Sequence, residues 1–319
     1  MALTGAYGDL YVRQYKDMIE HELQQRGSVL RPLVQVESVM GERTYFPKLG
    51  KASSYEVTGR NQEVEVQDQT NERRLVSPKM IEAAFQIEAL DMIRYQSSPQ
   101  PELVDALVME LGRQIDQKII EALAGSAGRE LDGSTSNASF DSNNTIAVGT
   151  NTFGSKDLAG LSLSGDTGLH EGKLQKALQI LQTNYALNPG DEVFVVAPAI
   201  QLAGLRSRVV SVPGLFFKNM PKMDLPMVDQ SLDGLLGMRF IQFENTGVDG
   251  SSDQYAYIFV RKAMKFGVWQ DVKVTIAEQT DKKGSPMLIK ANMAVGAVRM
   301  WEEAATRALC DPTPTYAVA

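Results

Sequence analysis

The residues of this chain that could do chemistry are few, and their spacing does not assemble them into a catalytic set. Glu302 and Glu303 are adjacent on an expected helix, so their carboxylates point apart and make a poor acid/base couple. Asp249 and Asp253 flank a Gly and Ser loop that could bind a hard cation only weakly. Neither place is expected to be an active site, and in the loop with Asp249 and Asp253 solvated acidic residues are favoured over a metal site.

The two histidines and the single cysteine also lack the partners that a nucleophile or a metal site requires. His21 and His170 each lie on an expected helix or at its start, where a surface or capping role is favoured over a general base. Cys310 has no nucleophile constellation nearby, and one cysteine excludes an intrachain disulfide. The sequence holds no glycine-rich phosphate loop and no Gly-x-Ser-x-Gly elbow. We therefore expect no enzyme, no cofactor and no metal.

Basic residues form the remaining group whose chemistry could matter. Arg73, Arg74 and Lys79 are close in sequence, and Lys262 and Lys265 follow an expected strand. These positions suit either ordinary surface charge or ion pairs between subunits. The formal net charge of −7 argues against a surface built mainly to hold phosphates. Any contact with nucleic acid is therefore expected to be local and weak.

The composition is that of an ordinary globular protein. Hydrophobic residues make up 43% and charged residues 22% of the 319 residues, which allows a sizeable core and about two domains. The first residues have no cationic flank followed by an apolar run, so no signal peptide is expected. No apolar stretch approaches the roughly 18 residues that span a bilayer, so we expect no membrane contact.

The elements that must position these residues begin with a long segment, Val36 to Gln96, that is patterned as strands and has no helical stripe. Thr44 to Phe46 precede Pro47, and Glu63 to Val66 alternate acidic and apolar residues, as in a hairpin. A lone hairpin is at best marginally stable in water. Two interpretations stay open, namely a solvated hairpin and a hairpin that another copy of the same protein buries.

Helices are expected before and after this segment. Asp9 to Arg26 form a short amphipathic helix, and Ile81 to Ala89 then alternate with a period of two, as in a half-buried strand. A second helix from Glu102 to Ala124 would be about 35 Å long at 1.5 Å per residue. Its packing positions recur at steps of four and are Leu103, Leu107, Leu111, Ile115 and Ile119.

The rest of the chain mixes strands with a few helices, which predicts the α+β class. Residues 126–168 are rich in Gly, Ser and Asn and predict a long surface insertion with one short strand near Ile146 to Val148. The later elements are a helix carrying Leu174, Leu178, Leu181 and Tyr185, a short helix from Pro198, and strands at Val193–Val196, Met238–Phe243, Tyr255–Val260, Val272–Ile276 and Met287–Ala297.

This order of elements resembles the major capsid proteins of tailed bacteriophages, which have the Hong Kong 97 fold, and is most similar to the short-tailed phage branch. The resemblance runs from Tyr7 to Arg307. It rests on the stretch Arg73 to Met80, the strand to Ala89 and the helix that ends in Leu123-Ala124-Gly125-Ser126, together with Phe46-Pro47-Lys48-Leu49-Gly50.

The resemblance implies an N-terminal arm, an extended β loop, a long spine helix, a peripheral domain and an apical domain. The expected boundaries are 1–35 for the arm, 36–77 for the extended β loop, 78–168 for the peripheral domain with the spine helix at 101–125 and the insertion at 126–168, 169–260 for the apical domain, and 261–319 for further peripheral strands and the C-terminal segment. The insertion has no obvious counterpart in the family, and it could be an outward decoration site or an internal loop.

The resemblance also implies a structural subunit that self-assembles into hexamers and pentamers and closes an icosahedral shell around double-stranded DNA. The extended loop would lie over a neighbouring subunit, with contact candidates Phe46, Leu49, Val64, Val66, Arg73, Arg74 and Lys79. Implied partners are a portal, a decoration protein, DNA held by weak non-specific contact, and a separate scaffolding protein, because the helix from Asp9 starts almost at once. The expected location is the virion capsid, assembled in the cytoplasm of an infected bacterium.

Two alternatives stay open at this point. An encapsulin-type nanocompartment shares the fold but encloses an enzyme cargo in place of DNA. An enzyme or a ligand-binding protein could use residues 126–168 as a lid, although the scarcity of histidines and nucleophiles argues against it.

Overall fold

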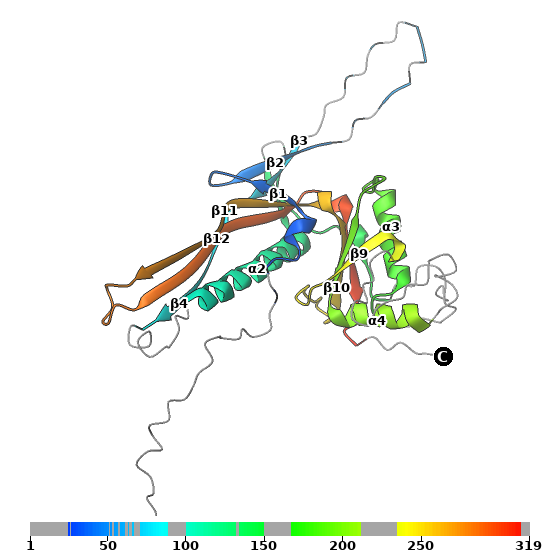
Figure 1. Cartoon of the computed structure of the whole chain (residues 1–319). Helices are drawn as coiled ribbons and strands as arrows, with labels where there is room; N and C mark the ends of the chain where they lie inside the picture. Colours follow the sequence, from blue (N-terminus) through cyan, green and yellow to red (C-terminus); the bar gives the residue numbers. More distant parts are fainter. Residues whose placement is uncertain are drawn as a thin grey trace, which may run out of the picture. The chain divides into compact units, whose positions relative to one another are not determined.

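The structure is a computed structural model of the chain, and Figure 1 shows its helices and strands. It describes residues 25, 27–50, 52, 54–56, 58–60, 63, 66, 71–88, 100–131, 134–149, 167–211 and 235–313. The helix expected from Asp9 to Arg26 lies outside these residues apart from Gln25, and so does Val64. Glu63 and Val66 are described, and neither lies in a strand.

The chain divides into two compact units. The first comprises Met1–Ser28, Lys79–Gln114 and Gln270–Ala294, and the second comprises Val29–Pro78, Ile115–Trp269 and Val295–Ala319. Three long elements contribute to both units, namely α2 (Gln100–Ala124), β11 (Met264–Glu278) and β12 (Met287–Arg299). The domain boundaries expected from the sequence stay predictions.

The long helix α2 confirms the expected packing stripe. Leu111 and Ile119 are fully buried, Leu107 and Ile115 are 3% exposed, and Leu103 at the start of the stripe is half-buried. Side chains at steps of four share one helix face, so a single stripe is buried along α2 from Leu107 to Leu123.

Strand β4 (Lys79–Ile87) belongs to the first unit and is an edge strand next to β12 in the sheet β1-β11-β12-β4. An ion pair joins β4 to β12, with Lys290 Nζ 2.8 Å from Glu82 Oε2. The apolar residues at every second position were expected to be buried on one face, and the structure confirms this only in part. Ile87 is buried, whereas Phe85 is 41% exposed.

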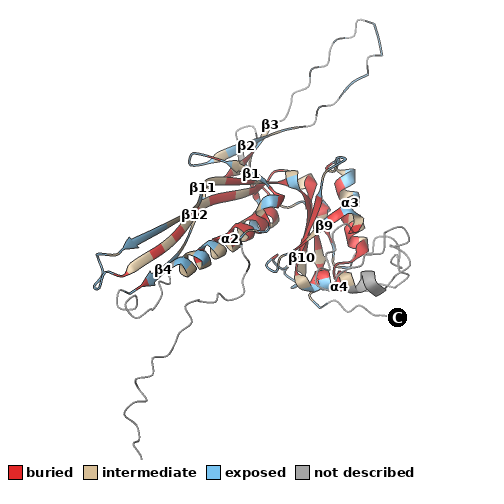
Figure 2. Ribbon diagram, viewed as in Figure 1, coloured by how far each residue is buried: buried red, intermediate tan, exposed pale blue. Residues whose placement is uncertain are grey.

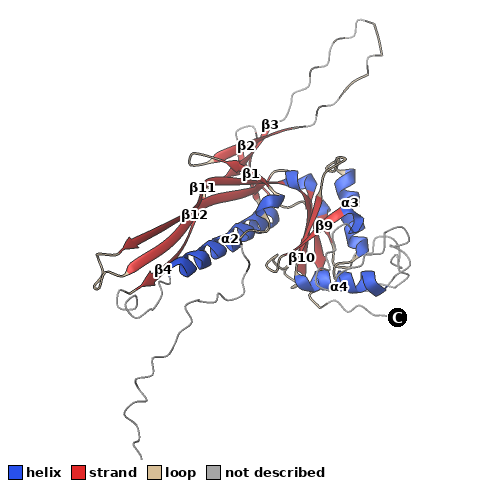
Figure 3. Cartoon of the chain, viewed as in Figure 1, coloured by secondary structure: helices blue, strands red, loops and turns tan. Residues whose placement is uncertain are grey.

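The second unit contains a five-stranded sheet of order β7-β13-β10-β8-β9. The inner strand β8 (Val193–Ala197), between β10 and β9, is buried throughout, as the apolar run predicts. The other strands are β7 (Thr145–Ile146), β13 (Ala305–Cys310), β10 (Gln254–Val260) and β9 (Met238–Gln242). Figure 3 shows the two helices of this region, α3 (Glu171–Thr183) and α4 (Ala199–Ser211), of which α3 contacts β13 and β7.

Short helices and turns complete the second unit. The 3-10 helices are η2 (Arg31–Leu33), η3 (Ser142–Asn144), η4 (Leu235–Gly237), η5 (Arg261–Ala263) and η6 (Glu302–Ala304). Tyr185 does not extend the stripe of α3 as expected, because the helix ends at Thr183 and the tyrosine is 83% exposed with a φ of 54°. Among the described residues, no helix is long and apolar enough to cross a membrane.

The expected hairpin is present at its base. β2 (Thr44–Leu49) pairs antiparallel with β3 (Asn71–Val76), from Thr44 opposite Val76 to Leu49 opposite Asn71. β1 (Gln35–Ser38) is not part of this hairpin, because it pairs parallel with β11. Gly41, with a φ of 90°, provides the turn between β1 and β2.

The expectation of a loop over residues 126–168 is wrong for its first part. β5 (Ala127–Leu131) pairs with β3, and β6 (Ser134–Ala138) pairs with β5, giving a four-stranded sheet of order β2-β3-β5-β6. The edge of β3 supplies backbone partners that residues of low strand propensity can use. The short strand expected near Ile146 is confirmed by β7.

Candidate subunit interface

The four-stranded sheet has two faces of different chemistry, because side chains alternate between the faces along each strand. On the inner face, Phe46, Arg74, Val76, Ala127 and Ala138 are all buried. The residues that alternate with these along β2 and β3 point to the outer face, and they are exposed or half-buried. Figure 2 shows the mixed burial along the two strands. One face of the hairpin base is therefore covered by its own chain and the other is open.

The outer face carries an apolar strip formed by Tyr45, Pro47, Leu49 and Leu75. Tyr45 is 43% exposed and Leu49 is 60% exposed. Leu75 lies opposite Tyr45 and spreads over Gly128, where an added Cβ would come within 3.2 Å of the Leu75 Cβ. Exposed apolar surface of this kind is typical of protein contact sites. We call these four residues the outer strip.

Charged residues border the outer strip. Arg73 is exposed. In the strand register it lies opposite Pro47 on β2 and opposite Glu130 on β5. Pro47 has no backbone N–H, and its place on the edge strand β2 disfavours pairing with a further strand. The open face, rather than the open edge, is therefore the part of the hairpin base suited to contact.

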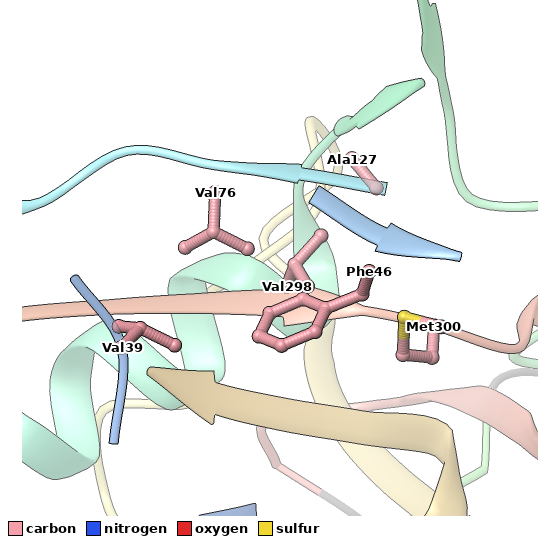
Figure 4. Packing of buried hydrophobic residues seen from close by; sticks show 6 residues of the cluster. All are labelled: Val39, Phe46, Val76, Ala127, Val298 and Met300. Atoms are coloured by element: carbon pink, nitrogen blue, oxygen red, sulfur yellow. The ribbon is translucent and has the colours of Figure 1, made fainter. Parts of the chain in front are cut away.

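The inner face packs into a small apolar cluster, drawn in Figure 4. Its buried members are Val39, Phe46, Val76, Ala127, Val298 and Met300, and Trp269 and Trp301 pack against it. Phe46 is only 4% exposed, so its side chain has little surface to offer a neighbouring subunit. We therefore remove Phe46 from the set of contact residues expected from the sequence.

Arg74 lies beside this cluster and is 1% exposed. Its Nη2 is 2.9 Å from Oε1 of Glu302 and 3.1 Å from Oε1 of Glu72. Both carboxylates belong to the same chain, which removes Arg74 from the expected contact set as well. A buried guanidinium needs such partners because desolvation of an unpaired charge is very costly.

Arg299, at the end of β12, is fully buried on the other side of Glu302. Its Nη1 donates hydrogen bonds to the carbonyls of Leu123 at 2.6 Å and Gly125 at 2.8 Å, where α2 ends. Its Nη2 donates to the carbonyl of Ala138 on β6 and lies 3.9 Å from Oε1 of Glu302. Burial lowers the pKa of Arg299 to about 10, which leaves the side chain charged at neutral pH.

Lys48 extends this charged group on β2. Its Nζ lies 3.9 Å from Glu72 Oε2, 3.6 Å from Glu303 Oε2 and 4.6 Å from the ring centre of Trp301. Glu302 and Glu303 were expected to make a poor acid/base couple, and the structure uses both carboxylates in ion pairs. The pairing of Glu302 with Arg74 and Arg299 was not predicted, since nothing in the local sequence marks Arg299 or a contact between Arg74 and Glu302.

The other basic residues that the sequence singled out also have partners within the chain. Lys262 Nζ is 2.9 Å from Asp191 Oδ2. Lys265 pairs with Glu37, and its Nζ lies 4.6 Å from the ring centre of Phe46. The two interpretations were ordinary surface charge and ion pairs between subunits. In the single chain, both lysines form ion pairs with carboxylates of the same chain.

The remaining contact candidates are exposed where the structure describes them. Leu49 is 60% exposed, Val66 is 89% exposed, and Arg73 and Lys79 are exposed. Val64 lies outside the described residues. These residues stay predictions of contact with a neighbouring subunit.

The histidine and the cysteine that the structure describes have roles in the fold. The His170 Nδ1 accepts a hydrogen bond from the Gly172 N–H at 3.1 Å, which caps α3. Cys310 is fully buried, and this burial raises the pKa of its thiol to about 11. Among the described residues, no cluster of three or more His, Cys, Asp or Glu side chains could hold a metal ion.

Comparison with known proteins places this geometry in a family. A sequence model described as phage capsid protein matches residues 8–312. The cyanophage Pam1 capsid has a TM-score of 0.72 at 12% identity, covering 97% of this chain and 99% of that chain. The capsid of Ralstonia phage GP4 has a TM-score of 0.69 at 13% identity, covering 99% of this chain and 100% of that chain. None of the curated proteins matches the chain.

The TM-scores show that the fold is shared despite the low sequence identities, and the family model covers nearly the whole sequence. The α+β architecture expected from the sequence is thus the Hong Kong 97 type of capsid fold. The chain belongs to the phage capsid protein family, and it is a structural capsid subunit rather than an enzyme.

Proposed function

We propose that this chain assembles into the hexamers and pentamers of an icosahedral shell that encloses double-stranded DNA. The observation that carries the proposal is the outer strip, because the chain covers only the inner face of the hairpin base and leaves Tyr45 and Leu49 exposed. A shell repeats the same subunit, so an open apolar surface on each copy can be covered by the next copy.

The contact residues follow from exposure. Leu49 and Val66 are the exposed apolar candidates, and Arg73 and Lys79 are the exposed charged candidates. Val64 is kept as a proposal from the sequence alone. Exposed apolar residues would supply most of the contact free energy, since exposed ion pairs contribute little.

The remaining partners follow from the family resemblance. The formal net charge of −7 suits weak, non-specific contact with packaged DNA whose phosphates are neutralised mainly by cations. A portal, a separate scaffolding protein and a decoration protein would complete assembly in the cytoplasm of an infected bacterium. Neither an enzyme cargo nor a lid-type enzyme is favoured by any feature of the structure.

The contact role of the outer strip can be tested with Leu49→Asp in cells where the unaltered chain forms closed shells. Leu49 is exposed, so the subunit should fold, while burial of a charge at a contact should reduce the yield of closed particles about tenfold or more. Val248→Asp is the matched control, because Val248 is 61% exposed in a loop of the same unit.

Electron microscopy and sedimentation would measure the yield. Normal numbers of normal shells from Leu49→Asp would contradict the proposed contact. Nuclease-protected double-stranded DNA in particles from infected cells is expected as well, and a protein cargo in place of DNA would contradict the enclosure of DNA.

A further inference from the structure

A single carboxylate, Glu302, stands between two buried guanidinium groups from different parts of the chain. Arg74 comes from β3 of the hairpin, and Arg299 comes from the end of β12. Oε1 of Glu302 lies 2.9 Å from Arg74 Nη2 and 3.9 Å from Arg299 Nη2. We call Arg74, Glu302 and Arg299 the arginine clamp.

The arginine clamp links the hairpin to the C-terminal end of α2. Arg299 donates hydrogen bonds to the carbonyls of Leu123 and Gly125, where α2 ends and the helix dipole favours a cation. Glu302 connects Arg299 to Arg74, and Arg74 is part of β3. A series of polar contacts therefore runs from α2 to the hairpin base through two buried arginines and the partly buried Glu302.

The chemistry of the clamp suits positioning better than stabilisation. A buried ion pair often stabilises a fold no more than apolar side chains of similar size would. Nε and Nη1 of Arg74 have no hydrogen-bond partner among the described residues, so the side chain is held mainly through its Nη2. An ion pair that contributes little net stability can still select one orientation, since a shift of the hairpin would separate the buried Arg74 from Glu302 and leave it with Glu72 alone.

The packing next to the clamp leaves little room for a shift. A Cβ added at Gly296 on β12 would lie 2.7 Å from Cγ1 of Val76 and 2.8 Å from the carbonyl oxygen of Ser77. The base of the hairpin therefore lies directly against the β12 backbone. Close packing and the buried ion pair restrict the same end of β3.

We propose that Glu302 and Arg74 are positioning residues that set the orientation of the hairpin, and with it the outer strip, for contact with the neighbouring subunit. This inference rests on the proposed contact role of the outer strip. It adds a specific claim about the unassembled subunit, namely that the clamp restricts the base of β2 and β3 before any neighbour binds.

The test is Arg74→Met, which removes one cation and leaves Glu302 paired with Arg299. Hydrogen exchange of the unassembled subunit should show protection of the amides in β2 and β3 about tenfold lower. Protection in β8 and β10 should stay unchanged, and the yield of closed shells should fall. Arg129→Met is the matched control, because Arg129 lies opposite Arg74 and is 3.3 Å from Glu72 but is not linked to Glu302.

Several results would overturn the inference. Unchanged exchange in β2 and β3, an equal loss of protection in β8 and β10, the same effect from Arg129→Met, or normal shells despite a loosened hairpin would each do so. If Arg74→Met does not fold, Arg74→Lys carries the same test, because it keeps the cation but replaces the planar guanidinium with an ammonium of different reach and geometry. Partial loss of protection in β2 and β3 is expected for Arg74→Lys, and full protection would overturn the inference.

The two proposals can fail separately. Leu49→Asp should leave the exchange of β2 and β3 unchanged while reducing shell yield, because Leu49 does not belong to the arginine clamp. Normal shells from Leu49→Asp would therefore contradict the contact role, whereas unchanged exchange in Arg74→Met would contradict the clamp.

Discussion

The five-stranded sheet and the four-stranded hairpin sheet belong to the same compact unit, but different forces hold them. In the five-stranded sheet, β8 is wholly buried and the Phe194 and Phe259 ring centres are 5.9 Å apart. The hairpin sheet has a small apolar cluster, two buried arginines and one open face. Figure 2 shows this contrast in burial.

The difference separates a sheet that completes its own core from a sheet that presents a surface. The free energy of apolar burial is proportional to the area buried and does not depend on direction. It therefore stabilises β8 and β10 without fixing their orientation finely. Ion pairs depend on geometry, so the hairpin sheet gains orientation from Arg74 and Glu302. The contrast predicts that the two sheets respond differently to similar substitutions.

The largest effect is expected from Phe194→Ala. Phe194 is fully buried on the inner strand β8 of the five-stranded sheet, and loss of a buried phenylalanine costs about 3–5 kcal/mol, a large share of the free energy of unfolding of a typical domain. Urea unfolding would measure the loss. Faster labelling of Cys310, a fully buried thiol in β13, would show that this sheet opens.

Phe46→Ala is the matched control, because Phe46 is 4% exposed in the hairpin cluster. As urea is increased, we expect this variant to change the fluorescence of Trp269 and Trp301, which pack against that cluster, at concentrations where Cys310 is still unreactive. Equal labelling of Cys310 in both variants would remove the distinction between the two sheets.

A medium effect is expected from Gly296→Ala, which acts where β12 packs against the hairpin and not on the five-stranded sheet. The added methyl group would lie 2.7 Å from Cγ1 of Val76 and 2.8 Å from the Ser77 carbonyl oxygen, and overpacking of this kind costs about 1–3 kcal/mol. Hydrogen exchange should show loss of protection in β3 while β8 keeps its protection. Loss of protection in β8 alone would contradict this placement. Gly250→Ala, with open space around its Cβ, is the control.

The sequence predicts best those elements whose burial is local in the chain. The run Val193 to Val196 predicts β8, and the steps of four from Leu107 to Ile119 predict the buried stripe of α2. β5 and β6 escape prediction because their Gly, Ser and Asn residues form strands only through backbone pairing that begins at β3. Local pattern cannot indicate that an edge elsewhere in the chain is available.

The candidate site shows the same limit in its side chains. Alternation along β2 predicts that Phe46 and Leu49 point to opposite faces, but it does not say which face the chain covers itself. Arg74 and Glu302 are 228 positions apart, so no spacing rule connects them. Arg73 and Arg74 therefore have the same interpretation in the sequence and opposite surroundings in the structure, where Arg73 is exposed and Arg74 is buried.

The smallest effect is expected from Lys262→Met, which removes a partly exposed ion pair for comparison with the buried clamp. Lys262 Nζ lies 2.9 Å from Asp191 Oδ2, and the hydrogen bond from Lys262, helped by one from the Asn188 N–H, lowers the pKa of Asp191. A carboxyl whose pKa is lower in the folded state adds stability above its unfolded pKa and loses it as pH falls through the folded value. The variant should therefore cost about 0.5 kcal/mol at neutral pH, and the difference from the unaltered chain should vanish on acidification. Urea unfolding at a series of pH values would measure this, and a difference that grew as the pH fell would contradict the assignment of Asp191 as the paired carboxylate.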